Sequence, residues 1–440
     1  MNIRLLLTNK KLVYRKKISN LPLGLRQAGF MFAATSLSNA LSYLVHFASS
    51  RMLGPAEYGV FASLSSFYLL ISTPLGILIL MTAYYLAQFQ ARGEIYRSGP
   101  LLISISKWVS LIGVLAGAAI VLGSPFLAAF LQIPSPTPIF VVAGMVLVGA
   151  LMAVVTGALQ GLQKFLVLGI NGIIGATLRL AFAIGLIALG LGASGALAAQ
   201  IFAGLITFVI AMVLLAPLLR QPESSRHSNH GLTIREVLAY AGLVLIGTTC
   251  LAALTNMDVM IVKHYFPPGE AGQYAAASVL AKIILFFPGA ITAVIFPKAV
   301  ERFALQQDSS RIVRQAAAAV VGLCGVLVVG YFLFPGLLIR LLFGPGYTTA
   351  IHLIGLFGAT MALYALVTLQ MTYYLSIHKA RYIALLVIST IFLAITLMLF
   401  HNSLLEVIII QLINAATLLV VGELTLRGII SDVLRPAVPE

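Results

Sequence analysis

The chain has 440 residues, of which 60% are hydrophobic and only 9% are charged, and its mean hydropathy is +1.05. This composition excludes an ordinary water-soluble globular protein. The formal net charge of +15 does not indicate nucleic-acid binding, because no basic soluble domain is present to carry it. Apolar segments of about 20 residues recur along the chain, and each must be a helix because lipid offers the backbone no hydrogen-bond partner. The sequence therefore predicts an all-α integral membrane protein.

Twelve transmembrane helices are predicted, separated by short polar connections. The first apolar segment is too long for the core of a signal peptide, so we expect it to remain in the protein. The two cysteines, Cys250 and Cys324, fall inside predicted spans and indicate neither a disulfide framework nor a metal site. The predicted spans are 28–52, 57–88, 102–131, 137–160, 165–190, 194–219, 236–263, 271–298, 315–341, 348–372, 382–400 and 404–426.

The positions of the cations predict the orientation in the membrane. Of the 27 Lys and Arg residues, Arg51, Lys263 and Arg340 fall on one side and Arg179 and Lys282 fall inside spans, which leaves 22 on the other side. Because Lys and Arg next to spans are retained in the cytoplasm, we expect both termini to be cytoplasmic in a multi-pass protein of the bacterial inner membrane. The positive charge then serves topology and attraction to anionic membrane lipids.

Two similar polar turn sequences occur in the chain. RMLGPAEYGVF, residues 51–61, is followed 212 residues later by KHYFPPGEAGQY, residues 263–274. Farther along, PFLAAFLQIPSP at 125–136 parallels PGLLIRLLFGPG at 335–346, now 210 residues apart. Several matches in the same order indicate duplication of a six-helix unit. The matched pairs are Arg51 and Lys263, Glu57 and Glu270, Gly59 and Gly272, Pro74 and Pro288, and Gln160 and Gln370.

The duplication predicts the domain organisation. Because six is an even number, both units enter the membrane in the same direction, so the repeats are parallel, as in transporters built from two lobes around a central substrate. The predicted parts are a basic cytoplasmic segment 1–27, an N-terminal six-helix lobe 28–219, a cytoplasmic linker 220–235, a C-terminal six-helix lobe 236–427 and a cytoplasmic tail 428–440.

The two turns, the segment TNMDVMIVKHYFPPGEAGQYAAAS and the turn LLFGPGYTTAIHLIGLFG resemble the polysaccharide-transporter branch of the multidrug, oligosaccharidyl-lipid and polysaccharide exporter superfamily. Members of this branch include O-antigen-type oligosaccharide flippases. The resemblance implies a V-shaped pair of six-helix bundles. It also implies alternating access that moves a polyprenyl-pyrophosphate-linked oligosaccharide from the cytoplasmic to the outer leaflet for polysaccharide biosynthesis.

Two cations stand near the middle of predicted spans, Arg179 in IGATLRLAF and Lys282 in VLAKIILFF. Each costs about 2.5–3.5 kcal/mol at the bilayer centre, so it is expected to face a partner or a wet cavity. We expect a cationic cavity in which Arg179 binds a pyrophosphate bidentately and Lys282 acts as a point charge. The alternative is that each cation pairs with a buried acid or a helix C-terminus.

Asp258, in TNMDVMIVK, is the one acid expected deep in a span, and its repeat counterpart is His46. Each lies five residues before a cation, Lys263 or Arg51. Asp258 and His46 are candidates for a gate or for coupling to Na⁺ or H⁺, and the alternative is a structural contact within one lobe. Arg51 and Lys263 are candidate substrate contacts at the outer mouth, although a long cation there can also reach the headgroups.

Movement between the lobes has its own candidate residues. Pro74 and Pro288 fall inside spans, where proline removes a backbone hydrogen bond and bends the helix, so both are candidate hinges. Closing the mouth would bring Arg51 and Lys263 together, and cross-lobe ion pairs with Asp258, Glu57 or Glu270 are expected to offset the repulsion.

No enzymatic constellation, phosphate-binding loop, metal-ligand set or cofactor motif is evident, so neither an enzyme nor a cofactor is predicted. The expected partners are the lipid-linked oligosaccharide, anionic lipids, Na⁺ or H⁺, and the polysaccharide polymerase and glycosyltransferases. Alternatives are a cation-coupled multidrug antiporter, which one buried acid against two buried cations disfavours, a peptidoglycan-precursor flippase, and a scaffold for glycan-assembly enzymes.

Overall fold

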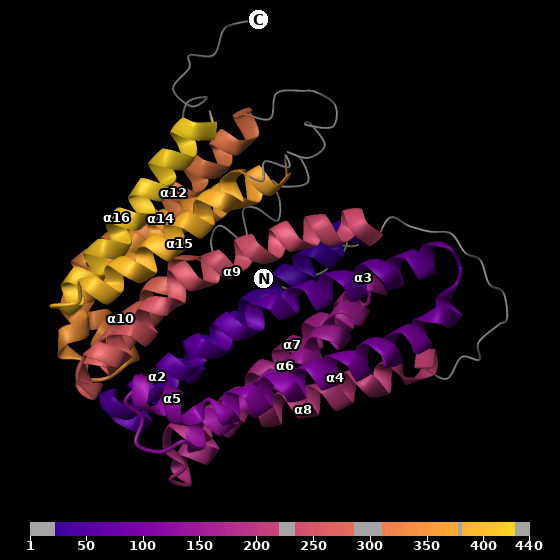
Figure 1. The fold of residues 1–440 in the computed structure, drawn as a ribbon, viewed down its shortest axis with the longest axis horizontal. Coiled ribbons are helices and arrows are strands. Elements are labelled where there is room, and N and C mark those ends of the chain that lie inside the picture. The colour runs from indigo at the N-terminus through magenta and orange to yellow at the C-terminus, as the bar shows by residue number, and fades with distance from the viewer. Residues whose placement is uncertain (1–22, 220–233, 286–309, 377–380, 427–440) are drawn as a thin grey trace, which may run out of the picture.

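The computed structural model describes residues 23–219, 234–285, 310–376 and 381–426, which form helices joined by short turns, without a strand in these ranges. Figure 1 shows two lobes that meet at one end and diverge toward the other, so that the molecule has the outline of a V. The predicted all-α, two-lobe fold is confirmed. The end at which the lobes meet carries the duplicated turns and is called the closed end. The opposite end, where the N-terminal lobe stops and the C-terminal lobe begins, is called the linker end.

The N-terminal lobe contains five long helical segments besides the first, kinked one. Glycines let its helices approach closely: a Cβ on Gly157 would lie 2.6 Å from the carbonyl oxygen of Ile79, and one on Gly161 would lie 2.5 Å from that of Ala83. Small residues at this spacing are typical of packed helices in membranes. The elements are α2 (Leu23–Ser72), η1 (Thr73–Leu75), α3 (Gly76–Ala91), η2 (Ile95–Arg97), α4 (Ser98–Leu122), α5 (Ser124–Phe130), α6 (Thr137–Gly161), α7 (Phe165–Ala188) and α8 (Gly192–Leu219).

The C-terminal lobe repeats this order, with a pair of helices around the turn followed by a short helix at the closed end. Buried tyrosines fill much of its interior, among them Tyr274, Tyr364 and Tyr382. Its described elements are α9 (Ile234–Tyr265), α10 (Pro268–Ala281), η3 (Lys282–Leu285), α12 (Ser310–Leu333), α13 (Pro335–Leu342), α14 (Thr348–Ser376), α15 (Arg381–Leu399) and α16 (Leu404–Leu426).

In the described ranges, nine helical segments are long and apolar enough to cross a membrane, and a bent pair would add a tenth. This count does not test the predicted twelve. The segment Gln27–Ala91 contains two predicted spans, and the predicted eighth span, 271–298, lies partly outside the described residues.

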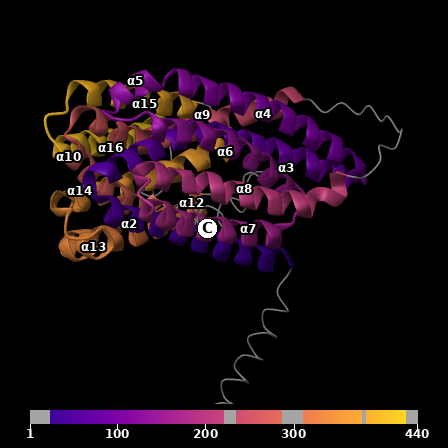
Figure 2. The ribbon, with the colours of Figure 1, turned by 90° about the horizontal axis from the view of Figure 1, so that it is seen from below.

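The predicted third and ninth spans are too long. The spans end at Leu122 and Leu333, and the residues after them form the short helices α5 and α13. Ala317–Leu333 and Pro335–Leu342 meet at 88°, because Pro335 begins a new helix rather than continuing the old one. Figure 2 shows α5, α10 and α13 at the same end of the molecule.

The first duplicated turn is a kink inside α2. Gly54 has φ 72° and ψ 172°, a conformation that side chains with a Cβ rarely adopt. Pro55 follows and starts the second helical part, a position at which the missing N–H of proline costs nothing. The turn therefore separates the first two spans without a loop.

A second break lies at Pro74, in the 3₁₀ turn η1 between α2 and α3. The hydroxyls of Thr73 and Ser72 donate to the carbonyl oxygen of Leu69 at 2.7 Å and 3.3 Å. These bonds satisfy part of the backbone that the break exposes. The predicted local interruption is confirmed, whereas movement at this hinge stays a prediction. The second predicted hinge, Pro288, lies outside the described residues.

Candidate functional site

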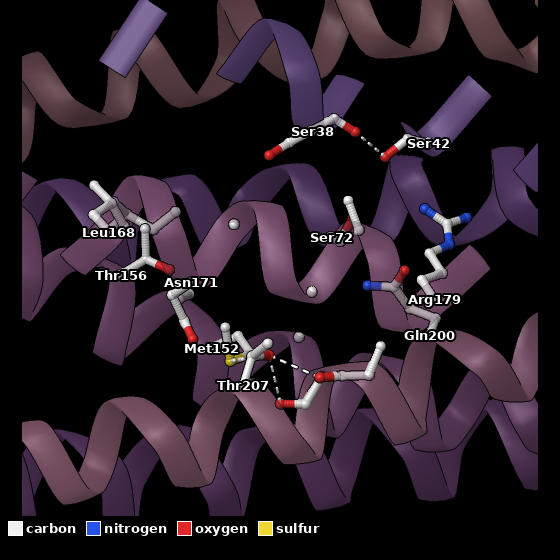
Figure 3. A pocket seen from close by; sticks show the side chains of 18 of the residues that line it. Ser38, Ser42, Ser72, Met152, Thr156, Leu168, Asn171, Arg179, Gln200 and Thr207 are labelled. Atoms are coloured by element: carbon white, nitrogen blue, oxygen red, sulfur yellow. Dashed lines mark hydrogen bonds between the residues drawn. The ribbon is translucent and has the colours of Figure 1, made fainter. Parts of the chain in front are cut away.

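A cavity of about 670 Å³ lies inside the N-terminal lobe, between α2, α3, α6, α7 and α8. We call it the polar cavity because its largely apolar wall contains a set of hydroxyl, amide and guanidinium groups. Its walls run from residues near the linker end, such as Gln160 and Leu168, to Arg179 and Gln200 toward mid-depth. Figure 3 shows Arg179 and Gln200 at one end and Thr156 and Asn171 at the other. The polar lining consists of Thr35, Ser38, Ser42, Tyr68, Ser72, Thr73, Thr156, Gln160, Asn171, Arg179, Gln200 and Thr207.

Two buried polar atoms in this cavity have no hydrogen-bond partner in the described residues. They are Nε of Arg179 and Oδ1 of Asn171, and the Asn171 side chain is only 6% exposed. Leaving such groups unsatisfied costs about 1–3 kcal/mol each, and more for a charged group. A donor and an acceptor in the cavity wall are thus without a partner in this conformation, while Tyr68 lies within electrostatic reach of the guanidinium.

Lys282 does not line this cavity. It lies where α10 passes into η3, and its Nζ donates to Oδ1 of Asn256 at 3.1 Å. Asp258 of the same lobe is fully buried and lies within electrostatic reach of Lys282. Its Oδ2 accepts a hydrogen bond of 2.8 Å from the hydroxyl of Tyr274, whereas its Oδ1 has no partner in the described part of the chain.

His46 lies near both buried cations. Its ring lies within electrostatic reach of both Arg179 and Lys282, and its Nδ1 is 3.3 Å from the hydroxyl of Tyr58. Arg179 belongs to the N-terminal lobe and Lys282 to the C-terminal lobe. The two predicted cations therefore approach the same region from opposite lobes, although the cavity described above contains only Arg179.

The duplicated turns cross each other at the closed end. A Cβ on Gly272 would lie 1.7 Å from the carbonyl oxygen of Pro55, and one on Gly59 would lie 3.1 Å from the backbone nitrogen of Gly272. No real side chain fits at the first distance, so the two lobes touch there through backbone alone. The glycines matched by the repeat are the residues that permit this contact.

Reciprocal contacts flank the crossing. Arg51 donates to the carbonyl oxygen of Leu341 in α13. His264, the residue after Lys263, contacts the carbonyl oxygen of Phe130 in α5 at 2.6 Å, and the two rings stack with centroids 4.2 Å apart. Each lobe thus presents a turn residue to the short helix of the other lobe.

This arrangement corrects the prediction for the closed end. Lys263 is only 1% exposed in this closed conformation, and its neighbour His264 makes the contact that corresponds to that of Arg51. A contact of Lys263 with the substrate at an open mouth stays a prediction. The expected cross-lobe ion pairs are not formed in this conformation, since the one ion pair among the described residues joins Arg97 to Glu94. Glu57 instead accepts a 2.8 Å hydrogen bond from the backbone of Ala193 at the start of α8.

Sequence reasoning missed the polar lining of the cavity and the partner of each turn. Asn171, Gln200 and Tyr68 carry no spacing signal, because they converge from three separate helices. The sequence did contain a signal for the two short helices that the turns contact. The segments that match at a spacing of 210 residues contain α5 and α13, and a proline near the start of each segment marks the start of a new helix.

The fold, the apolar helices and the meeting of two lobes at one end define a multi-pass membrane protein with a two-lobe transporter fold. The model of the polysaccharide biosynthesis protein family matches residues 25–303, more than half of the chain. The chain therefore belongs to this family, and the resemblance predicted from the sequence is confirmed. No curated protein sequence matches the chain.

Solved structures share the fold at low sequence identity. An inward-facing multidrug resistance MATE family transporter of the MOP superfamily superposes with a TM-score of 0.72 at 12% identity, over 91% of this chain and 99% of that chain. The lipid II flippase MurJ, inward closed, gives 0.69 at 12% identity, over 92% and 89%. An outward-facing MATE family transporter gives 0.60 at 14% identity, over 93% and 97%.

Proposed function

We propose that this protein is a flippase that moves a polyprenyl-pyrophosphate-linked oligosaccharide from the cytoplasmic to the outer leaflet by alternating access. The observation that carries this proposal is the polar cavity of the N-terminal lobe. Its hydroxyl and amide groups match the hydrogen-bonding groups of a glycan, and Arg179 at its deep end matches an anionic phosphate. Membership of the polysaccharide biosynthesis protein family supports the same substrate class.

The size of the cavity limits what it holds. About 670 Å³ is within the range of pockets that enclose one drug-sized ligand, about 300–1,000 Å³. The cavity therefore takes the pyrophosphate and the sugar next to it. The remaining glycan extends toward the linker end, and the polyprenyl chain stays in lipid.

The linker end faces the cytoplasm in this proposal. The distribution of Lys and Arg along the chain supports this orientation. The structure then corresponds to the inward-facing state, in which the duplicated turns close the outer mouth and the cavity is accessible from inside. Opening requires the contacts of Arg51, His264 and Gly272 to separate.

A multidrug antiporter is the weaker alternative. Among the residues that the structure describes, the cavity wall contains one cation and no acid, so it attracts anions rather than cationic drugs. Asp258 is fully buried and lies outside this cavity, which suits a coupling site for Na⁺ or H⁺ or a gate.

The test is flipping by the purified protein in phosphatidylcholine vesicles that contain a lipid-linked oligosaccharide with a fluorescent tag on the glycan. We expect the protein to make the inner-leaflet tag accessible to an impermeant quencher. We also expect polyprenyl-pyrophosphate alone to compete and a free oligosaccharide not to compete. Flipping of cationic dyes with no effect on the tagged lipid would overturn the proposal in favour of the antiporter.

A further inference from the structure

A second hollow, of about 460 Å³, lies on the outer surface of the N-terminal lobe. It is formed by α4 and α8, which pack against each other along the edge of the lobe that is farthest from α12 and α16 in Figure 1. It is separate from the polar cavity, with which it shares no residue. Its lining consists of Leu102, Ile103, Ser106, Lys107, Ser110 and Met212.

The face of α4 that carries this hollow is turned toward lipid. Ile103 and Leu111 are 45% and 49% exposed, and Lys107 stands between them at four-residue spacing, so the three share one side of the helix. An exposed apolar stripe on a membrane helix contacts acyl chains. Lys107 is therefore a cation on a lipid-facing surface, where it requires a counter-charge or access to water.

No carboxylate supplies that counter-charge in the described part of the chain. The one ion pair there uses Glu94, which binds Arg97 with N and O atoms 3.0 Å apart. The surroundings of Lys107 are instead hydroxyls. Ser110 donates to the carbonyl oxygen of Ser106 at 2.7 Å. The hydroxyl of Ser106 makes no hydrogen bond within the described residues, so it can donate to a phosphate oxygen.

The hollow lies in the half of the lobe that is nearer the linker end. At 1.5 Å per residue, Lys107 lies about 14 Å from the start of α4 and Met212 lies about 10 Å from the end of α8, both measured from the linker end. A lysine at such a depth extends its ammonium back toward the lipid phosphates. Trp108, which is 65% exposed, is next to it in the sequence and is also turned outward.

We propose that the hollow between α4 and α8 binds the headgroup of an anionic phospholipid, such as phosphatidylglycerol. Lys107 pairs with the phosphate, Ser106 donates to a second phosphate oxygen, and one acyl chain lies along Ile103 and Met212. This proposal does not rest on the substrate proposed above, because the site faces the bilayer rather than the interior of a lobe.

The single tryptophan of the chain makes the site directly measurable, since Trp108 is adjacent to Lys107. The protein is reconstituted in phosphatidylcholine vesicles that contain brominated-acyl phosphatidylglycerol or, at the same mole fraction, brominated-acyl phosphatidylcholine. We expect phosphatidylglycerol to half-quench Trp108 at an about fivefold lower mole fraction, the enrichment that one lysine near an anionic headgroup provides.

The variants decide whether Lys107 is the cause. Lys107→Gln should make the two brominated lipids equivalent, and Lys107→Arg should keep the preference. Lys164→Gln, at the start of α7 on the same side of the membrane, should also keep it. Inorganic phosphate added at constant ionic strength should leave the preference unchanged.

Three results would overturn the proposal. One is equal quenching by the two lipids in the wild-type protein. Another is a preference that survives Lys107→Gln or disappears in Lys164→Gln as well, which would assign it to general surface charge. The third is loss of the preference on addition of inorganic phosphate, which would make the ligand a free anion.

Discussion

The two lobes share an order of helices and differ in the chemistry of their interiors. In the N-terminal lobe the helices leave a polar cavity with Arg179 at its deep end. In the C-terminal lobe, Tyr274 and Tyr364 fill the interior near Asp258, and Lys282 is bound to Asn256. The two lobes therefore share an order of helices, while Lys282 is bound within its own lobe and Nε of Arg179 has no partner in the described residues.

The symmetry is retained where the lobes meet. His46 contacts Tyr58 and Asp258 contacts Tyr274, so in each lobe the helix before the turn is held to the helix after it. The turns then cross at Gly59 and Gly272. In the function proposed above, the contacts that close the mouth come from both repeats, whereas the proposed ligand contacts come from the N-terminal lobe.

The largest effect is expected from Gly272→Ala, which tests whether backbone contact closes the two lobes. The added Cβ would lie 1.7 Å from the carbonyl oxygen of Pro55, so the lobes must separate. Overpacking costs about 1–3 kcal/mol, which shifts the closed population about 5- to 150-fold. We expect loss of flipping in the vesicle assay and a longer distance between spin labels at the exposed positions Met52 and Tyr265.

Gly269→Ala is the matched control, because nothing lies within 4 Å of the Cβ it would add on the same helix. It should flip lipid at the wild-type rate and keep the wild-type distance between the labels. A Gly272→Ala protein that behaves like this control would show that the lobes do not close through the crossing turns.

The second prediction concerns the unequal roles of the two buried cations. Arg179→Gln removes a charge whose Nε has no protein partner in the described residues, and loss of a charge-assisted bond to the ligand costs about 1.5–3 kcal/mol. We expect an about 10- to 100-fold rise in the substrate concentration that half-saturates flipping. Lys282→Gln should raise it by less than about tenfold, because Lys282 already donates to Asn256.

Thr177→Ala serves as the control on the same helix, since the Thr177 hydroxyl is already bonded to the carbonyl oxygen of Ile173. It should leave half-saturation unchanged. Equal losses in Arg179→Gln and Lys282→Gln would mean that both lobes hold the ligand, and the contrast between them would have to be abandoned.

The order of helices and the two-lobe arrangement could largely be predicted from the sequence, because each membrane helix is determined by its own stretch of residues. Apolar length predicts each span, and the repeated turn predicts two equivalent lobes. The turn at Gly54 and the break at Pro74 follow from the backbone properties of two residue types. The predicted match of Gly59 with Gly272 also turned out to mark the point where the lobes touch.

The site was less predictable because its contacts depend on packing between distant helices. Arg179 and Lys282 were correctly singled out as buried cations, but sequence depth alone could not distinguish a cavity wall from a cation held by Asn256. Lys263 matches Arg51 in the repeat, yet in this conformation it is buried and its neighbour His264 makes the contact between the lobes. A change of one position on a helix rotates a side chain by about 100°, and the repeat does not specify that rotation.

The third prediction compares Asp258 with its counterpart His46. Asp258→Asn removes a buried charge while an amide oxygen can still accept the hydrogen bond from Tyr274, so the helices should stay paired. We expect flipping to slow several-fold and its response to pH or Na⁺ to flatten, whereas His46→Gln should leave that response unchanged. If flipping falls in Asp258→Asn but neither dependence changes, Asp258 does not couple an ion and only a role in the gate survives.

The smallest effects are expected at the reciprocal contacts of the closed end, which test whether the repeats share the closing force equally. His264→Ala removes a hydrogen bond to Phe130 and a stacked ring pair, and Arg51→Ala removes the bond to Leu341. Each change should cost about 1 kcal/mol and lower the closed population, measured with the same spin labels, about fivefold. Because the two contacts share no residue, the double variant should show the sum of the two free-energy changes.

Met52→Ala is the control, because it removes an exposed side chain beside Arg51. It should have no effect on the closed population when the spin labels are placed at Leu53 and Tyr265. If the closed population of the double variant is no lower than that of either single variant, the two contacts break together. The two turns then close the lobes as one cooperative unit and do not contribute independently.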